Sequence, residues 1–240
     1  MALIDNLISY WKLDEASGTR EDAHSTNDLT DNNTVLAAAG IINDGADFES
    51  ANTESLSITD AAQSGLAITG DLSISLWTKL ESALGADEGR QFISKAVAGQ
   101  RSYSFLLESF GGNFIDFSVS DDGTANSTAQ KTWEPSAGVF YHVAVTYDAS
   151  AGEVKFYIDG SQLSTTVTGM PTSIFDSTTA FYIGVFGTGT GSPFDGIIDE
   201  VGIWNKVLTD AEVTELYNGG AGLAYPLTIS STFRSQIIIM

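Results

Sequence analysis

The stretch that decides the fold is Phe194-Asp195-Gly196-Ile197-Ile198-Asp199-Glu200-Val201-Gly202-Ile203-Trp204. Its apolar residues fall on both faces of a β-strand, which predicts Ile197, Val201 and Ile203 on one face and Ile198 and Trp204 on the other. A strand that is apolar on both faces belongs in the middle of a packed sheet. Asp199 and Glu200 lie at its centre, where unpaired carboxylates are costly to bury. We therefore expect protein donors for Glu200 and a bound cation for Asp199.

A short helix is predicted directly after this strand. Thr209-Asp210-Ala211-Glu212 is a capping-box pattern that begins a helix from about residue 209 to 218, and Gly219-Gly220 ends it. The rest of the chain shows strand patterning and turn residues, as in 72–77, where Leu72, Ile74 and Leu76 share one face. The sequence therefore predicts an all-β fold with one short C-terminal helix.

The clearest hairpin covers residues 139–160. Residues 139–148 alternate between the two faces of a strand, and 153–160 return after a turn that contains Gly152. His142 lies within the alternating apolar strand, where a single histidine is typical of a structural imidazole. With only His24 and His142 in the chain, we find no Ser-His-Asp arrangement and no pattern of histidines spaced to bind zinc.

Three motif clusters stand in a fixed order along the chain. They are Tyr10-Trp11-x-Leu13-Asp14-Glu15 with its following loop, the hairpin at 139–160, and Asp199-Glu200-Val201 with the helix after it. Together they resemble the laminin-G-like domains of the concanavalin A-like lectin/glucanase superfamily. The resemblance covers roughly residues 6 to 225. It implies two antiparallel sheets packed as a jelly-roll sandwich.

The resemblance also implies a structural calcium ion. In the family, the first loop and the final Asp-Glu-Val strand meet in space, often around calcium. Carried over to this sequence, the ligands are Asp22, Asn27 and Asp199, with backbone carbonyls completing the shell. Calcium prefers such oxygen ligands. The residues alone leave another interpretation open, in which Asp22 and Asn27 only form Asx-turns.

The charge of the chain limits its partners. Ten basic and 31 acidic residues give a net charge of −21, which argues against nucleic acid and anionic membranes as partners. No apolar run reaches the ~20 residues of a membrane span. Cysteine is absent, so disulfides and thiolate metal sites are excluded. The first residues, Met1 to Asp5, show no basic region or long apolar core, so we expect no secretion signal.

Catalysis is not expected, although the same superfamily contains glycoside hydrolases. Retaining hydrolysis needs two carboxylates ~5–5.5 Å apart, which a single strand supplies as an i, i+2 pair. No such run occurs in the sequence. Asp195 and Asp199 share a face but lie ~13 Å apart at the rise of a strand. Asp199 and Glu200 point to opposite faces.

Glycan binding would need exposed aromatic side chains beside polar groups. The candidates are Tyr103, Trp133 and Phe186, with Asn113 and Asn126 near them in sequence. Trp133 is the strongest candidate because residues 131–135 otherwise read as a polar connection. The alternative for each aromatic residue is packing at the edge of the sandwich.

The last residues differ from the rest of the chain. We predict a sandwich domain at 1–225 and an interaction arm at 226–240, whose Ile237-Ile238-Ile239 would pair with the sheet edge of a neighbouring subunit in an oligomer or larger assembly. The competing interpretation folds the arm back over its own sandwich. We therefore expect a non-catalytic binding and display module on a phage virion (capsid decoration, fibre or tail) or bacterial surface, with glycan adhesion. A dedicated calcium-stabilised carbohydrate-binding module is the alternative, and a glycoside hydrolase comes third.

Overall fold

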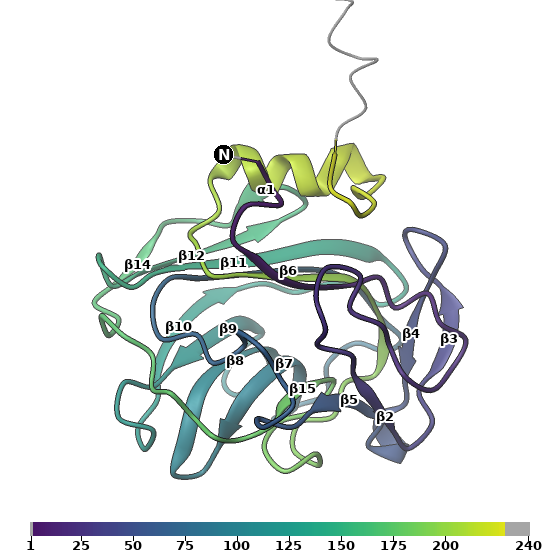
Figure 1. The fold of residues 1–240 in the computed structure, drawn as a ribbon, viewed down its shortest axis with the longest axis horizontal. Coiled ribbons are helices and arrows are strands. Elements are labelled where there is room, and N and C mark those ends of the chain that lie inside the picture. Colours follow the sequence, from purple (N-terminus) through teal and green to yellow (C-terminus); the bar gives the residue numbers. More distant parts are fainter. Residues whose placement is uncertain (1, 229–240) are drawn as a thin grey trace, which may run out of the picture.

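The computed structural model describes residues 2–228. In it, two antiparallel sheets pack face to face (Figure 1). The nine-stranded sheet has the order β13-β12-β11-β6-β16-β4-β3, with β1 paired to β16 and β14 paired to β12. The seven-stranded sheet has the order β10-β9-β8-β7-β15-β5-β2. This arrangement confirms the predicted two-sheet sandwich.

The bounds of the elements are as follows. The nine-stranded sheet contains β1 Leu7–Trp11, β3 Leu36–Ala39, β4 Asp44–Phe48, β6 Leu72–Leu80, β11 Phe140–Asp148, β12 Glu153–Ile158, β13 Ser161–Gln162, β14 Val167–Thr168 and β16 Gly196–Trp204. The seven-stranded sheet contains β2 Thr30–Asn32, β5 Ser55–Ile58, β7 Gly89–Val97, β8 Gln100–Glu108, β9 Phe114–Val119, β10 Ser127–Thr132 and β15 Phe181–Ile183. The helical elements are α1 Asp210–Tyr217 and the short 3₁₀ turns η1 Ser50–Asn52 and η2 Asn218–Gly220.

Strand β16 lies inside its sheet and is buried along its whole length, as its apolar pattern predicts. A bulge places one extra residue between Asp199 and Gly202 relative to β6, and Glu200 there has a φ of 51°. The extra residue reverses the alternation of faces. Ile198 therefore joins Val201 and Ile203 in the core between the sheets, and the predicted grouping of Ile197 with Val201 is wrong.

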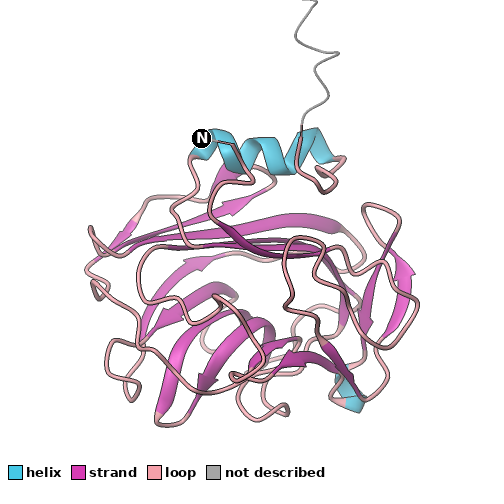
Figure 2. Cartoon of the chain, viewed as in Figure 1, coloured by secondary structure: helices cyan, strands magenta, loops and turns pink. Residues whose placement is uncertain are grey.

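Helix α1 lies across the outer face of the nine-stranded sheet (Figures 1 and 2). Its predicted capping box is present, because the Thr209 hydroxyl accepts from the Glu212 N–H at 3.2 Å and the Glu212 carboxylate accepts from the Thr209 N–H at 2.8 Å. Trp204, Leu208, Val213 and Leu216 form a second apolar cluster between helix and sheet. No described helix is long and apolar enough to cross a membrane.

The structure corrects two further predictions, one about residues 131–135 and one about Leu227. Residues 131–135 were expected to be a polar connection, but residues 127–132 form the edge strand β10, of which only Ala129 is fully buried. Leu227, expected in the arm, is 4% exposed and packs in the cluster under α1. The rest of the predicted arm, from residue 229, lies outside the described residues.

Candidate functional site: a polar groove on the seven-stranded sheet

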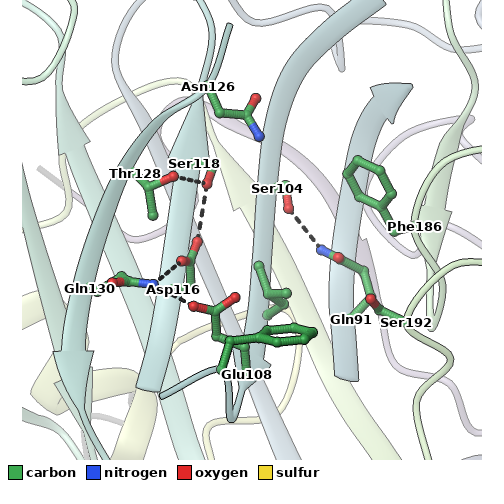
Figure 3. Close-up of a pocket in the computed structure, with 12 residues that line it drawn as sticks. Gln91, Ser104, Glu108, Asp116, Ser118, Asn126, Thr128, Gln130, Phe186 and Ser192 are labelled. Carbon is green, nitrogen blue, oxygen red and sulfur yellow. Dashed lines mark hydrogen bonds between the residues drawn. The ribbon is translucent and has the colours of Figure 1, made fainter. Parts of the chain in front are cut away.

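A groove with a volume of about 430 Å³ lies on strands β7 to β10 of the seven-stranded sheet, on the face turned away from the core (Figure 3). Alternation along the strands produces this face: in β9, Ile115, Phe117 and Val119 enter the core, while Asp116 and Ser118 face the groove. The groove is lined by Gln91, Ser104, Leu106, Glu108, Phe110, Asp116, Ser118, Asn126, Thr128, Gln130, Phe186 and Ser192.

The strand register sets polar side chains in rows across the groove. Asp116 is paired with Gln130 on β10 and with Leu106 on β8. In the next row, Ser118 is paired with Thr128 and Ser104. Side chains directly opposite one another in an antiparallel sheet lie close enough to interact. The rows therefore bring together groups that are distant in sequence.

A hydrogen-bond network connects these rows (Figure 3). The Gln130 amide nitrogen donates to Asp116 Oδ2 at 3.0 Å and also to Glu108 Oε1. Ser118 Oγ donates to Asp116 Oδ1 at 3.1 Å and shares a 2.8 Å hydrogen bond with Thr128 Oγ1. The two carboxylates thus accept from one amide nitrogen. This network fixes the positions of the acidic groups before any ligand arrives.

The groove changes the acidity of both carboxyl groups. Burial raises the pKa of Asp116 to about 7, and the hydrogen bonds from Gln130 and Ser118 act in the opposite direction. Burial also raises the pKa of Glu108. Near neutral pH, Asp116 therefore exchanges between a form that only accepts hydrogen bonds and one that can also donate.

Gln91 on β7 forms part of the groove floor and is fully buried. Its amide nitrogen donates to Ser104 Oγ at 3.1 Å and to the Phe105 carbonyl at 2.9 Å. Its Oε1 has no hydrogen-bond partner among the described residues. A buried acceptor without a partner is costly, and because Gln91 is fully buried, a ligand would reach this atom only if the side chain moved.

Two aromatic side chains border the polar floor. Phe110, in the turn between β8 and β9, is 54% exposed. Phe186, in the loop after β15, is half-buried, and Asn126 is exposed beside β10. An apolar ring next to converging polar groups is the usual composition of a small-molecule site. Such a surface can hold a sugar by its hydroxyls and by the apolar face of its ring.

The structure separates the glycan-binding candidates that the sequence suggested. Asn126 and Phe186 both line the groove. Tyr103 does not fit an exposed platform, because it is 1% exposed in the core and its hydroxyl donates to the Leu66 carbonyl at 2.8 Å. Trp133 is half-buried against the core, stands edge-on to Tyr141, and directly precedes residues that line a second hollow. That hollow is lined by Ala83, Leu84, Asn113, Glu134, Pro135, Ser136 and Ala137.

Asp22 and Asn27, two of the predicted calcium ligands, are engaged with protein groups. The Asp22 carboxylate accepts from the backbone N–H groups of Tyr10, His24, Ser25 and Asn27 at 3.0–3.2 Å. The Asn27 amide donates to Ser9 and to the Ser64 carbonyl and accepts from the Ser64 N–H. These contacts fix the first loop against β1. Both residues therefore have the hydrogen bonds expected of turn-stabilising groups.

Asp199, the third predicted ligand, has a different environment. Its Oδ2 accepts from the N–H groups of Ile41 and Ile42 at 2.7 and 3.2 Å, while its Oδ1 has no partner among the described residues. Asp14 Oδ1 and Glu200 Oε1 are likewise buried without a partner. The other Glu200 oxygen accepts from the Tyr10 hydroxyl. A carboxylate oxygen is the type of ligand that a hard divalent cation takes, but these three residues are not among the described acidic groups whose ligand atoms all lie within 4.8 Å of one another.

Burial controls the acidity of this second group of carboxyls. It raises the pKa of Asp199 to about 7 and that of Glu200 to about 8, with repulsion from Asp14 acting in the same direction. A Cβ at Gly40 would collide with the Asp199 carboxylate, so the backbone fits closely around it. A third acidic group, Asp47, Glu49 and Glu81, lies elsewhere and is largely exposed.

Comparison with known proteins identifies the family. The model of the concanavalin A-like lectin/glucanases superfamily named Laminin_G_3 matches residues 50–214. The chain belongs to this superfamily. The match confirms the resemblance that the sequence motifs suggested. No curated protein sequence matches the chain.

Several solved structures share the fold. Domain 4 of the extracellular arabinanase AbnA from Geobacillus stearothermophilus, solved with arabinotriose, is 22% identical with a TM-score of 0.66, over 88% of this chain and 97% of that one. The binding domain of botulinum neurotoxin DC in complex with SialylT is 15% identical with a TM-score of 0.68, and the match covers 90% of this chain but 52% of the toxin domain. A structure of botulinum neurotoxin type C, a toxin whose cell entry depends on interaction with two ganglioside molecules, is 16% identical with a TM-score of 0.70. The match covers 95% of this chain and 53% of the toxin chain.

Proposed function

We propose that the chain is a non-catalytic glycan-binding module and that its ligand lies in the groove on β7 to β10. The observation that carries this proposal is the polar floor of the groove, set between the exposed ring of Phe110 and the ring of Phe186. Two structural neighbours, the arabinanase domain and the toxin binding domain, are seen with sugar ligands, which supports a glycan.

A glycan array tests this function with wild-type protein and Phe110→Ala. Phe110 is exposed, so its removal should leave the melting temperature unchanged. Loss of the aromatic contact at the edge of the groove should weaken glycan binding by roughly tenfold. Leu36→Ala is the matched control, since Leu36 is 53% exposed on β3 of the other sheet. Trp133→Ala tests the second hollow. If this variant loses glycan binding but keeps the melting temperature of the wild-type protein, the ligand lies in the second hollow and not in the groove.

Glycoside hydrolysis is a second candidate function because of one observation. Glu108 and Asp116 lie on neighbouring strands and accept from the same Gln130 nitrogen, so they form a cross-strand carboxylate pair. Retaining hydrolases use carboxylates ~5–5.5 Å apart. The bridging amide occupies the position between the two carboxylates, which favours binding over catalysis. Release of reducing ends from oligosaccharides, abolished by Glu108→Gln, would establish the hydrolase instead.

We also propose that calcium stabilises the module at Asp199. The buried Oδ1 of Asp199, which has no partner among the described residues, supports this assignment, whereas Asp22 and Asn27 are engaged with protein groups. For the setting, we propose display on a phage virion or bacterial surface assembly, joined to neighbouring subunits through residues 229–240. The apolar sequence of that segment supports the subunit contact.

A further inference from the structure

The charge of the groove restricts which sugars can enter it. Its only ionisable lining residues are Glu108 and Asp116, and no lysine, arginine or histidine lines it in the described part of the chain. Arg90 on β7 is directed elsewhere, where it pairs with Glu88 at 2.8 Å. The net charge of −21 adds to the negative potential. Nothing in the groove therefore offsets the charge of an anionic ligand.

The hydrogen-bonding groups of the groove point to the same conclusion. The amide nitrogens of Gln130 and Gln91 already donate within the protein. Among the remaining groups of the groove, the Glu108 oxygen that does not contact Gln130 is an acceptor, and the Asn126 amide and the Ser192 hydroxyl can donate as well as accept. Acceptors in a ligand-binding floor are satisfied by ligand donors. Sugar hydroxyls supply such donors, whereas a carboxylate or sulfate brings only further acceptors and a repelled charge.

We propose that this groove selects uncharged, hydroxyl-rich glycans and excludes glycans that carry a carboxylate or sulfate at the bound position. The inference rests on the proposed glycan-binding function and names the ligand class of that site. The inferred preference for uncharged glycans distinguishes this chain from the structural neighbour seen in complex with SialylT, which has the same fold at 15% identity. Selection follows from the negative charge of Glu108 and of the ionised form of Asp116, since the rest of the floor is neutral.

Matched sugars that differ only in charge provide the test. Neutral and acidic partners are compared on one array and by calorimetry: lactose with sialyl-lactose, and xylo-oligosaccharides with and without a glucuronic acid branch. We expect the neutral partner of the bound pair to bind at least roughly tenfold more tightly, as a like charge at close range requires. The difference should shrink at high salt because exposed charges are screened.

Glu108→Gln removes one charge while keeping the shape of the side chain, and it should reduce the preference for the neutral partner. Glu21→Gln, an exposed residue outside the groove, changes the net charge equally and should leave the preference unchanged. Melting curves show that both variants fold. Equal or tighter binding of the acidic partner by wild-type protein would overturn the inference while leaving glycan binding intact. Retention of no glycan by wild-type protein would instead overturn the proposed function, and the inference with it.

Discussion

At the scale of single residues, the buried carboxyl groups of Asp199, Glu200 and Asp116 make the stability of the fold depend on pH. Their pKa values are raised by burial to about 7, 8 and 7, against ~4 for exposed groups. The folded state therefore holds protons that the unfolded state has released. The contribution of these groups to the free energy of unfolding is fully present below pH ~4, and it is lost as the pH rises through 7 and 8.

We therefore predict that, in the presence of a chelator, the melting temperature falls between pH 5 and pH 8.5. The free energy of unfolding should fall by about 1.4 kcal/mol per pH unit at most for each group that titrates. Asp148 and Asp210 have lowered pKa values and lose their contribution only in more acidic solution, outside this window. Asp199→Asn should flatten the slope. A melting temperature that rises steadily to pH 8.5 would contradict the prediction.

Calcium should reverse this loss. A divalent cation favours the ionised carboxylates, so added calcium should raise the melting temperature at pH 8 more than at pH 5. At a concentration 100 times the dissociation constant the stabilisation is ~2.7 kcal/mol. Asp199→Asn should abolish the effect, and magnesium serves as the control ion. Identical melting curves with calcium and with chelator would contradict the proposed calcium site.

Sequence reasoning found some residues of the groove and missed others for a physical reason. Asn126 and Phe186 stood out as a polar and an aromatic residue suited to glycan binding, and both line the groove. Glu108 and Asp116 were overlooked because the search for a carboxylate pair followed a single strand. Their contact depends on the register of β8 against β9 and on the Gln130 bridge, which no local pattern specifies. Alternation within 114–119 was the available signal, since it already directs Asp116 away from the core.

At the scale of elements, α1 was predictable to within a residue because its start is encoded locally. Thr209 and Glu212 satisfy each other's backbone, and this needs no distant contact. The bulge in β16 and the edge strand β10 were not predictable in this way. The bulge is defined only against β6, and β10 holds a single fully buried apolar residue, Ala129, so it shows no apolar alternation.

The helix cap gives a direct prediction. Thr209→Ala removes the acceptor for the Glu212 N–H, and it should lower the free energy of unfolding by about 1 kcal/mol. Thr209→Ser keeps the hydroxyl and should restore most of the loss. Because Val213 and Leu216 hold α1 on the sheet, the helix should remain docked in both variants, and circular dichroism should be unchanged. An unaltered denaturation midpoint in Thr209→Ala would show that packing alone fixes the helix.

At the scale of the whole molecule, a net charge of −21 opposes contact between copies of the chain. Any assembly therefore needs an apolar contact strong enough to overcome this repulsion. Residues 229–240 contain Phe233 and Ile237-Ile238-Ile239 with Arg234 as the only charged residue. Burial of three isoleucine side chains is worth ~1.5–3 kcal/mol each, which is sufficient to hold a strand against a neighbouring sheet edge.

Deletion of residues 229–240 tests this contact by size-exclusion chromatography with light scattering. We expect the full chain to form an oligomer and the shortened chain to be a folded monomer, because the buried Leu227 is retained. Deletion from 227 is the matched comparison and should also lower stability, since it removes Leu227 from the cluster under α1. High salt should strengthen the oligomer by screening the acidic surfaces. A full chain that stays monomeric, or an oligomer that survives the deletion, would exclude the intersubunit arm. A monomer destabilised by the shorter deletion would identify the segment as a strap on its own sandwich.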